Sequence, residues 1–216
     1  SKGTSLGVHE SQSRLWENIV GRSRNFWTWA YPQLQETFPK QLAAVDVETF
    51  YRAINRVAPS FVRVEADEAT YNLHIMVRFE IETALVNGDI PLDRLPQVWN
   101  EKFEAYLGIV PPDNKLGVLQ DIHWSSGLIG YFPTYAIGNL LAAQYYRQAL
   151  LAHPSIPDEI AKGQFDTLRG WMRDNIYQHG RKFTADELTQ RITGEPIECG
   201  YFIDGLREKY GAIYGV

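Results

Sequence analysis

DEATYNLHIMVRFEIETALV, residues 67–86, is the stretch that decides the fold. Its apolar side chains recur at the spacing of a helix that has one buried face. Asp67 stands where an N-cap would accept hydrogen bonds from the first free backbone N–H groups. Asn87-Gly88 follows and supplies the left-handed stop with which many helices end. The stretch therefore predicts one long helix.

The helical period continues along most of the chain, and few segments alternate as strands do. Further helices are expected over residues 8–30, after the N-cap Asp46, from Pro91 to Gly108, over 134–152, over 165–176, after the capping box of Thr184 and Glu187, and over about 200–210. The predicted fold class is all-α, one compact multi-helix domain over residues 1–216.

Composition excludes several classes of protein. The net charge of −5, with both signs interspersed, argues against a nucleic-acid or anionic-membrane surface. No apolar run approaches the roughly 20 residues that span a bilayer. Cys199 is the only cysteine, so a reduced, cytoplasmic compartment is expected and a Cys-only metal site is excluded. The start Ser1-Lys2-Gly3-Thr4 has no initiator Met and is interpreted as a cut or processed end.

Glu10 is the first candidate site residue. Ser13 and Arg14 follow three and four residues later, on the same helix face. A carboxylate oriented by such neighbours can ligate a metal ion. The alternative is an ordinary surface ion pair worth a few tenths of a kcal/mol. His9 points about 100° away around the helix, so it is expected to be packed or hydrogen-bonded and not to share a metal with Glu10.

Arg63 and Asp67 form the second candidate, just before the long helix. With Asp67 as a partner four residues away, the guanidinium of Arg63 could grip a carboxylate at two points. A purely structural Arg–Asp pair is the alternative. Glu68, Tyr71 and His74 follow at three-residue steps and suggest an internal polar network.

Asp121 and His123 form the third candidate, beside Gln120 and Trp124. In an irregular turn, Asp121 could fix the tautomer of a histidine, and His123 could donate to an oxyanion. A capped loop with a stacked Trp is the alternative. A tyrosine hydroxyl from the aromatic segment 130–135 could also bind an oxyanion.

In order and spacing, these clusters resemble the carboxypeptidase Taq (M32) family of metallocarboxypeptidases. The resemblance rests on Gly7-Val8-His9-Glu10-Ser11-Gln12-Ser13-Arg14, on Val62-Arg63-Val64-Glu65-Ala66-Asp67-Glu68 with Thr70-Tyr71-Asn72-Leu73-His74, on Gly117-Val118-Leu119-Gln120-Asp121-Ile122-His123-Trp124, and on Gly130-Tyr131-Phe132-Pro133-Thr134-Tyr135 with Gly138-Asn139-Leu140. Val62, where Ile is common in the family, is a small departure. The similarity runs to Val216.

The resemblance implies a two-lobed, largely helical, zincin-like metallopeptidase, of which this chain resembles only the C-terminal part. Two histidine ligands and the glutamate base would come from an H-E-x-x-H helix, a motif that is absent from the 216 residues. Glu10 maps onto the third metal ligand. The implied metal is Zn2+, with Co2+ or Mn2+ as alternatives.

The remaining motifs imply a groove for a peptide with a free C-terminal carboxylate. The residues implied in substrate binding are Arg63, Asp67, Gln120 and Asp121. His123, Tyr131 or Tyr135 would stabilise the tetrahedral oxyanion, and the sequence does not decide among the three.

Ligand number sets the expectation for this chain alone. A three-ligand catalytic zinc site cannot be built from one carboxylate, so the chain is predicted to be inactive by itself. The resemblance also implies a homodimer. The alternative function is a non-catalytic, all-helical binding or scaffold domain that keeps the motifs without the chemistry.

Overall fold

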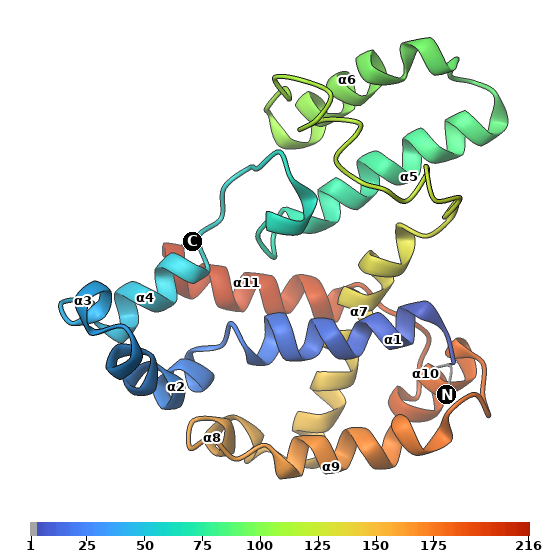
Figure 1. Cartoon of the computed structure of the whole chain (residues 1–216). Helices are drawn as coiled ribbons and strands as arrows, with labels where there is room; N and C mark the ends of the chain where they lie inside the picture. The colour runs from blue at the N-terminus through green and yellow to red at the C-terminus, as the bar shows by residue number, and fades with distance from the viewer. Residues whose placement is uncertain (1–3) are drawn as a thin grey trace. The chain divides into compact units, whose positions relative to one another are not determined.

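The computed structural model describes residues 4–216, so most of the start that was interpreted as a cut end, Ser1-Lys2-Gly3, lies outside the described residues. Within residues 4–216 all regular structure is helical, which confirms the all-α prediction. No helix in this range combines the length and the apolar character that crossing a bilayer requires. The elements (Figure 1) are α1 Leu6–Arg14, η1 Leu15–Val20, α2 Arg24–Thr37, α3 Pro39–Leu42, α4 Val47–Ile54, η2 Arg63–Glu65, α5 Tyr71–Asn87, η3 Leu92–Arg94, α6 Leu95–Leu107, α7 Pro133–Ala152, α8 Ile156–Ile160, α9 Asp166–Asn175, η4 Tyr177–His179, α10 Ala185–Thr193 and α11 Gly200–Tyr214.

The chain groups into two compact units. Unit 1 comprises the residues up to Asn55 together with Ile137–Val216, and unit 2 is the continuous segment Arg56–Ala136. The boundary falls inside α7, whose first turn up to Ala136 belongs to unit 2 and whose remaining residues from Ile137 belong to unit 1. The prediction of a single helical domain over residues 1–216 stays a prediction.

The core of unit 1 is aliphatic with an aromatic margin. Leu15, Ala142 and Met172 are almost completely buried in one cluster. Trp16 packs edge-on against Phe165 at this margin, with ring centroids 6.0 Å apart. Much of the aromatic content therefore serves packing in this unit.

Unit 2 is built around α5 and α6, which run side by side and are joined by a short turn at one end (Figure 1). Val77 and Ile81 of α5 are buried against Trp99 and Phe103 of α6. The two α6 rings stack with centroids 5.7 Å apart. After α6, residues 109–132 form no helix and carry the Asp121–His123 segment in turns.

Local signals placed most helix ends correctly, but one long helix was predicted wrongly. The helix expected over residues 8–30 is divided into α1, the π-helix η1 and α2. It is interrupted after Gly21, where an added Cβ would lie 2.8 Å from the carbonyl oxygen of Glu17. Ser23 then restarts the chain as an N-cap, because its Oγ accepts from the backbone N–H of Phe26 at 3.1 Å.

Candidate functional site

Glu10 lies on α1, and its carboxylate is held in one orientation. Arg14 Nε donates to Oε1 at 2.8 Å. The Ser13 hydroxyl donates to the backbone carbonyl of Glu10 at 2.8 Å and shares its proton with Oε2 at 3.1 Å. The side chain is 20% exposed and that of Arg14 is 12% exposed, so this is not a freely solvated surface pair. The three-residue and four-residue spacings predicted both partners. His9, which was expected to be packed or hydrogen-bonded, is exposed instead.

The other flank of Glu10 is formed by α7. A Cβ added to Gly138 would lie 2.6 Å from Glu10 Cγ and 2.9 Å from Glu10 Cβ. The Glu10 side chain therefore fills the space that any other residue at position 138 would need.

The chemistry of Glu10 fits a metal ligand. A carboxylate has about four lone-pair positions, and only two are engaged by Arg14 and Ser13. Ligating carboxylates are commonly oriented by such hydrogen bonds from neighbours. Over the described part of the chain, no three His, Cys, Asp or Glu side chains come together as a metal site. Glu10 thus fits as one ligand of a set that these residues do not complete.

Arg63 belongs to unit 2 and is 5% exposed. Its Nη2 and Nε donate to Asp121 Oδ1 at 2.7 and 3.1 Å, and its Nη1 donates to the hydroxyl oxygen of Tyr71 at 2.8 Å. The expected pairing with Asp67 is wrong, because the carboxylate that holds Arg63 comes from a segment 58 residues later. Local spacing could not reveal a contact made by chain folding.

Asp67 acts on backbone groups instead. Its Oδ1 accepts from the N–H of Ala69 and of Thr70, both at 2.9 Å. Its Oδ2 accepts from the Thr70 hydroxyl at 2.8 Å and from the N–H of Ala58 at 3.1 Å. The prediction of Asp67 as the N-cap is wrong, because α5 begins at Tyr71 and its N-cap is Thr70. Asp67 instead ties the segment that precedes Arg63 to the turn before α5.

Arg78, the second cation of this network, was not predicted from the sequence. Arg78 lies on α5, is 0% exposed, and donates from Nε to Asp121 Oδ2 at 2.6 Å. Glu82 is 6% exposed and accepts from Trp124 Nε1 at 2.6 Å. A signal was present, because His74, Arg78 and Glu82 follow at four-residue steps and so share one buried face of the helix. The three-residue steps on which the prediction relied drift away from this face.

The charges in this network perturb one another. Burial would raise the pKa of the Asp121 carboxyl, but the hydrogen bond from Arg63 and the charges of Arg78 and Arg63 outweigh it, so this pKa is lowered. Burial lowers the pKa of Arg78 to about 10, against the attraction of Asp121, and leaves it charged near neutral pH. Burial, with the charges of Arg78 and Arg63, lowers the pKa of His74 to about 3. His74 is therefore a neutral histidine.

His123 contacts tyrosine more closely than it contacts Asp121. Its Nε2 lies 3.0 Å from the hydroxyl of Tyr135, whereas its Nδ1 lies 3.6 Å from Asp121 Oδ1, beyond hydrogen-bond distance. The ring centroids of His123 and Tyr131 are 5.5 Å apart. Burial lowers the pKa of His123, with the charge of Asp121 opposing and those of the two arginines adding to the shift. The structure thus groups the three candidate oxyanion donors.

Gln120 holds this segment in place. Its Oε1 accepts from the backbone N–H of Arg63 at 2.9 Å, and its Nε2 donates to the carbonyl of Phe61 at 2.8 Å. Three of the predicted substrate-binding residues of unit 2, Arg63, Gln120 and Asp121, therefore form one hydrogen-bonded group. The fourth, Asp67, bonds instead to Ala58, Ala69 and Thr70.

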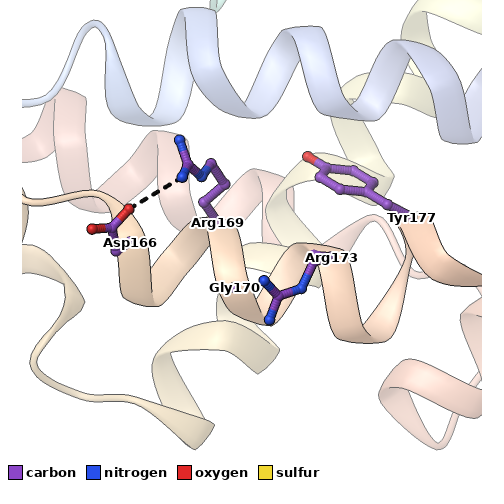
Figure 2. Close-up of a pocket in the computed structure, with 5 residues that line it drawn as sticks. All are labelled: Asp166, Arg169, Gly170, Arg173 and Tyr177. Carbon is purple, nitrogen blue, oxygen red and sulfur yellow. Dashed lines mark ion pairs between the residues drawn. The ribbon is translucent and has the colours of Figure 1, made fainter.

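A separate hollow in unit 1 contains none of the predicted site residues (Figure 2). It is lined by Asp166, Arg169, Gly170, Arg173 and Tyr177. The side chains of Arg169 and Arg173 are 71% and 68% exposed, and each is paired with its own aspartate. Exposed, internally compensated arginines give no reason to place chemistry there.

Residues 4–216 form a helical frame without strands that fixes a carboxylate suited to metal ligation, as is typical of a helical metalloprotein. The chain belongs to the carboxypeptidase Taq (M32) metallopeptidase family, whose profile matches residues 1–210. It is 48% identical to thermostable carboxypeptidase 1 of Thermus thermophilus, over 98% of this chain and 41% of that protein. It is 42% identical to carboxypeptidase 1 of Bacillus subtilis, over 99% of this chain and 43% of that protein.

Solved structures agree with the sequence comparison. The M32 carboxypeptidase of Deinococcus radiodurans matches with a TM-score of 0.97 at 47% identity, over 100% of this chain and 44% of that one. The predicted family is therefore confirmed. The chain spans about two fifths of the length of the curated relatives it matches.

Proposed function

We propose that this chain is the part of a zinc-dependent metallocarboxypeptidase that carries one metal ligand and the groove residues for the end of a peptide. The observation that carries the proposal is the Glu10 carboxylate, which Arg14 and Ser13 hold with lone pairs to spare, in a chain that belongs to a metallopeptidase family. The reaction is release of the C-terminal amino acid from a peptide.

Glu10 would hold the metal together with two histidines of an H-E-x-x-H helix, which residues 1–216 do not contain. When bound, zinc would supply the Lewis acidity that activates water for attack on a peptide bond, and cobalt or manganese could supply the same. Arg14 and Ser13 would keep the Glu10 carboxylate turned in one direction, so that little ordering is left for the moment of binding.

Arg63 would bind the free carboxylate of the peptide terminus. Three of its five N–H groups are engaged by Asp121 and Tyr71, which fixes the guanidinium plane and leaves two N–H groups. A planar fork held in this way suits a carboxylate, and this would make the enzyme trim ends and not cut within chains. Asp67 and Gln120 would position Arg63 without touching the peptide. Gln120 accepts from the backbone N–H of Arg63, and Asp67 accepts from the N–H of Ala58 in the segment before it.

His123, Tyr131 and Tyr135 would stabilise the oxyanion. Because its pKa is lowered, His123 is neutral near neutral pH and would act as a hydrogen-bond donor, not as a cation. The Tyr135 hydroxyl, 3.0 Å from its Nε2, can exchange the proton position with it. The group that touches the oxyanion is one of these three.

The chain alone would be inactive, because it brings one ligand of three. The whole enzyme would be a homodimer, which light scattering tests directly. A cytoplasmic location of the protein is supported by the free, exposed thiol of Cys199, because an oxidising compartment would not favour such a thiol.

The test uses a polypeptide that joins this chain to an H-E-x-x-H helix. It should release the last residue of an N-blocked dipeptide, and a chelator should stop the reaction. Glu10→Gln should lower metal content, and Arg63→Ala should raise KM more than it lowers kcat. Arg169→Ala, in the unrelated hollow, is the matched control and should change neither. Full metal content and full activity in both site variants would overturn these roles and favour a non-catalytic binding or scaffold domain.

A further inference from the structure

Gly138 lies within α7, where a glycine has no conformational reason to be. Its φ is not positive, unlike that of Gly88 or Gly108 at helix ends. Inside a helix, glycine costs stability relative to alanine because it loses more backbone entropy on folding. A glycine here calls for a reason from packing.

The reason is the Glu10 side chain. A Cβ at position 138 would lie 2.6 Å from Glu10 Cγ, 2.9 Å from Glu10 Cβ and 3.2 Å from its carbonyl carbon. These atoms are close to the backbone of α1, so they cannot move aside as the tip of a flexible side chain can. Gly170, also within a helix, has no atom within 4 Å of its added Cβ.

Glu10 is therefore confined from both sides. Gly138 closes one side by contact with the aliphatic stem, and Arg14 and Ser13 fix the carboxylate oxygens by hydrogen bonds. The same pair of helices meets at Gly7 of α1, whose Cβ would lie 2.7 Å from Ile137 Cγ2 without touching Glu10. Gly7 thus provides a control at the same helix contact.

We propose that Gly138 is a positioning residue: its missing side chain makes the slot on α7 that sets the rotamer of Glu10, and thereby the direction in which the carboxylate meets a divalent cation. The cation itself rests on the proposed function. The slot is a property of this chain alone, and the two can be tested separately.

The slot is tested on the 216-residue chain by a double-mutant cycle. Gly138→Ala should lower the thermal midpoint by several degrees in the native chain and by less than half as much in a Glu10→Ala background. Gly7→Ala should lower it equally in both backgrounds, and Gly170→Ala should not lower it. If Gly138→Ala alone does not fold, recovery in the double variant with Glu10→Ala supports the slot, and failure to recover overturns it.

A spectroscopic readout distinguishes positioning from simple packing. The NMR signal of the Arg14 Nε–H, which donates to Glu10, should shift and exchange faster in Gly138→Ala but not in Gly7→Ala. An unmoved Arg14 signal, with equal midpoint losses in both Glu10 backgrounds, would overturn the proposal.

The metal is tested in the polypeptide that includes the H-E-x-x-H helix. Gly138→Ala should raise the dissociation constant for Co2+ by about tenfold or more and change the visible spectrum of the cobalt form. Gly7→Ala should leave both unchanged. A moved Arg14 signal with an unchanged cobalt constant would overturn the metal role of Glu10 in the proposed function, whereas the slot would stand.

Discussion

Asp121 is the residue on which the polar core of unit 2 depends. Its two oxygens face two buried guanidinium groups, Arg63 at 2.7 Å and Arg78 at 2.6 Å. One carboxylate therefore compensates two cations in a region of low polarity, and each arginine relies on a charge that it shares. Stacking helps to hold Arg78, whose guanidinium carbon lies 4.7 Å from the centroid of the Trp99 ring.

Asp121→Asn should destabilise the chain strongly, because it leaves two buried cations without a counter-charge. We expect a loss of about 3–5 kcal/mol in the free energy of unfolding, measured by urea titration at neutral pH. Asp174→Asn is the matched control, since Asp174 pairs with Arg173 at the surface, where the side chains are 58% and 68% exposed. It should change stability by less than about 0.5 kcal/mol. Equal effects would mean that the buried network contributes no more than a surface pair.

His74 should make stability fall as the solution is acidified. The unfolded histidine binds its proton near pH 6.5, but burial holds the pKa of the folded one at about 3. The stability that the lowered pKa of His74 contributes is fully present above pH 6.5. It is lost as the pH falls toward 3, at up to about 1.4 kcal/mol per pH unit. Urea unfolding at pH 7 and pH 5 should show this loss, and His74→Gln should reduce it. The slope that remains belongs to His123 and to carboxyl groups such as Asp121, whose pKa values are lowered too. An unchanged slope in His74→Gln would show that His74 is not held neutral.

At the scale of the helices, two uncrowded glycines should respond to alanine in opposite directions. Gly88 ends α5 with φ +80, and its added Cβ would meet nothing within 4 Å, so its value is purely conformational. Gly88→Ala should therefore cost about 1 kcal/mol. Gly170, inside α9 and equally uncrowded, should gain about 0.5–1 kcal/mol when changed to alanine. Thermal unfolding of the two variants measures both, and the same sign for both would contradict this account.

Helix ends were predictable because their causes are local. Asp46 accepts from the N–H of Thr49 at 2.7 Å, and Thr184 with Glu187 makes the expected capping box. The interruption at Gly21–Ser23 was missed, since it depends on the π-helical turn of η1, which has no strong local signal. Periodicity describes faces of helices and does not show where one gives way to another.

The site was predictable in residue type but not in pairing. Glu10, Ser13 and Arg14 interact as their spacing predicted, because all three share one turn of α1. The partner of Arg63 was not predictable from local spacing, because Asp121 reaches it only when the segment after α6 folds back over α5. Local sequence identifies side chains that need a partner, and the chain path chooses the partner.

At the scale of the whole molecule, the candidate residues are divided between the two units. Glu10 belongs to unit 1, whereas Arg63, Asp121, His123 and Tyr135 belong to unit 2. The core clusters follow the same division, with Val77 and its neighbours wholly inside unit 2. Each unit therefore supports its own candidate residues, and the contacts that fix Glu10, with Arg14, Ser13 and Gly138, all lie within unit 1.

Zinc titration of the 216-residue chain tests what this division leaves incomplete. Among residues 4–216 no three potential ligands gather, so zinc would meet Glu10 without a complete set of protein ligands. A catalytic zinc site uses three protein ligands, and one carboxylate competes poorly with water. Isothermal titration should show no saturation in the micromolar range, and Glu10→Gln should give the same curve. Tight one-to-one binding that Glu10→Gln abolishes would mean that this chain completes a metal site by itself, and the proposed dependence on an H-E-x-x-H helix would be wrong.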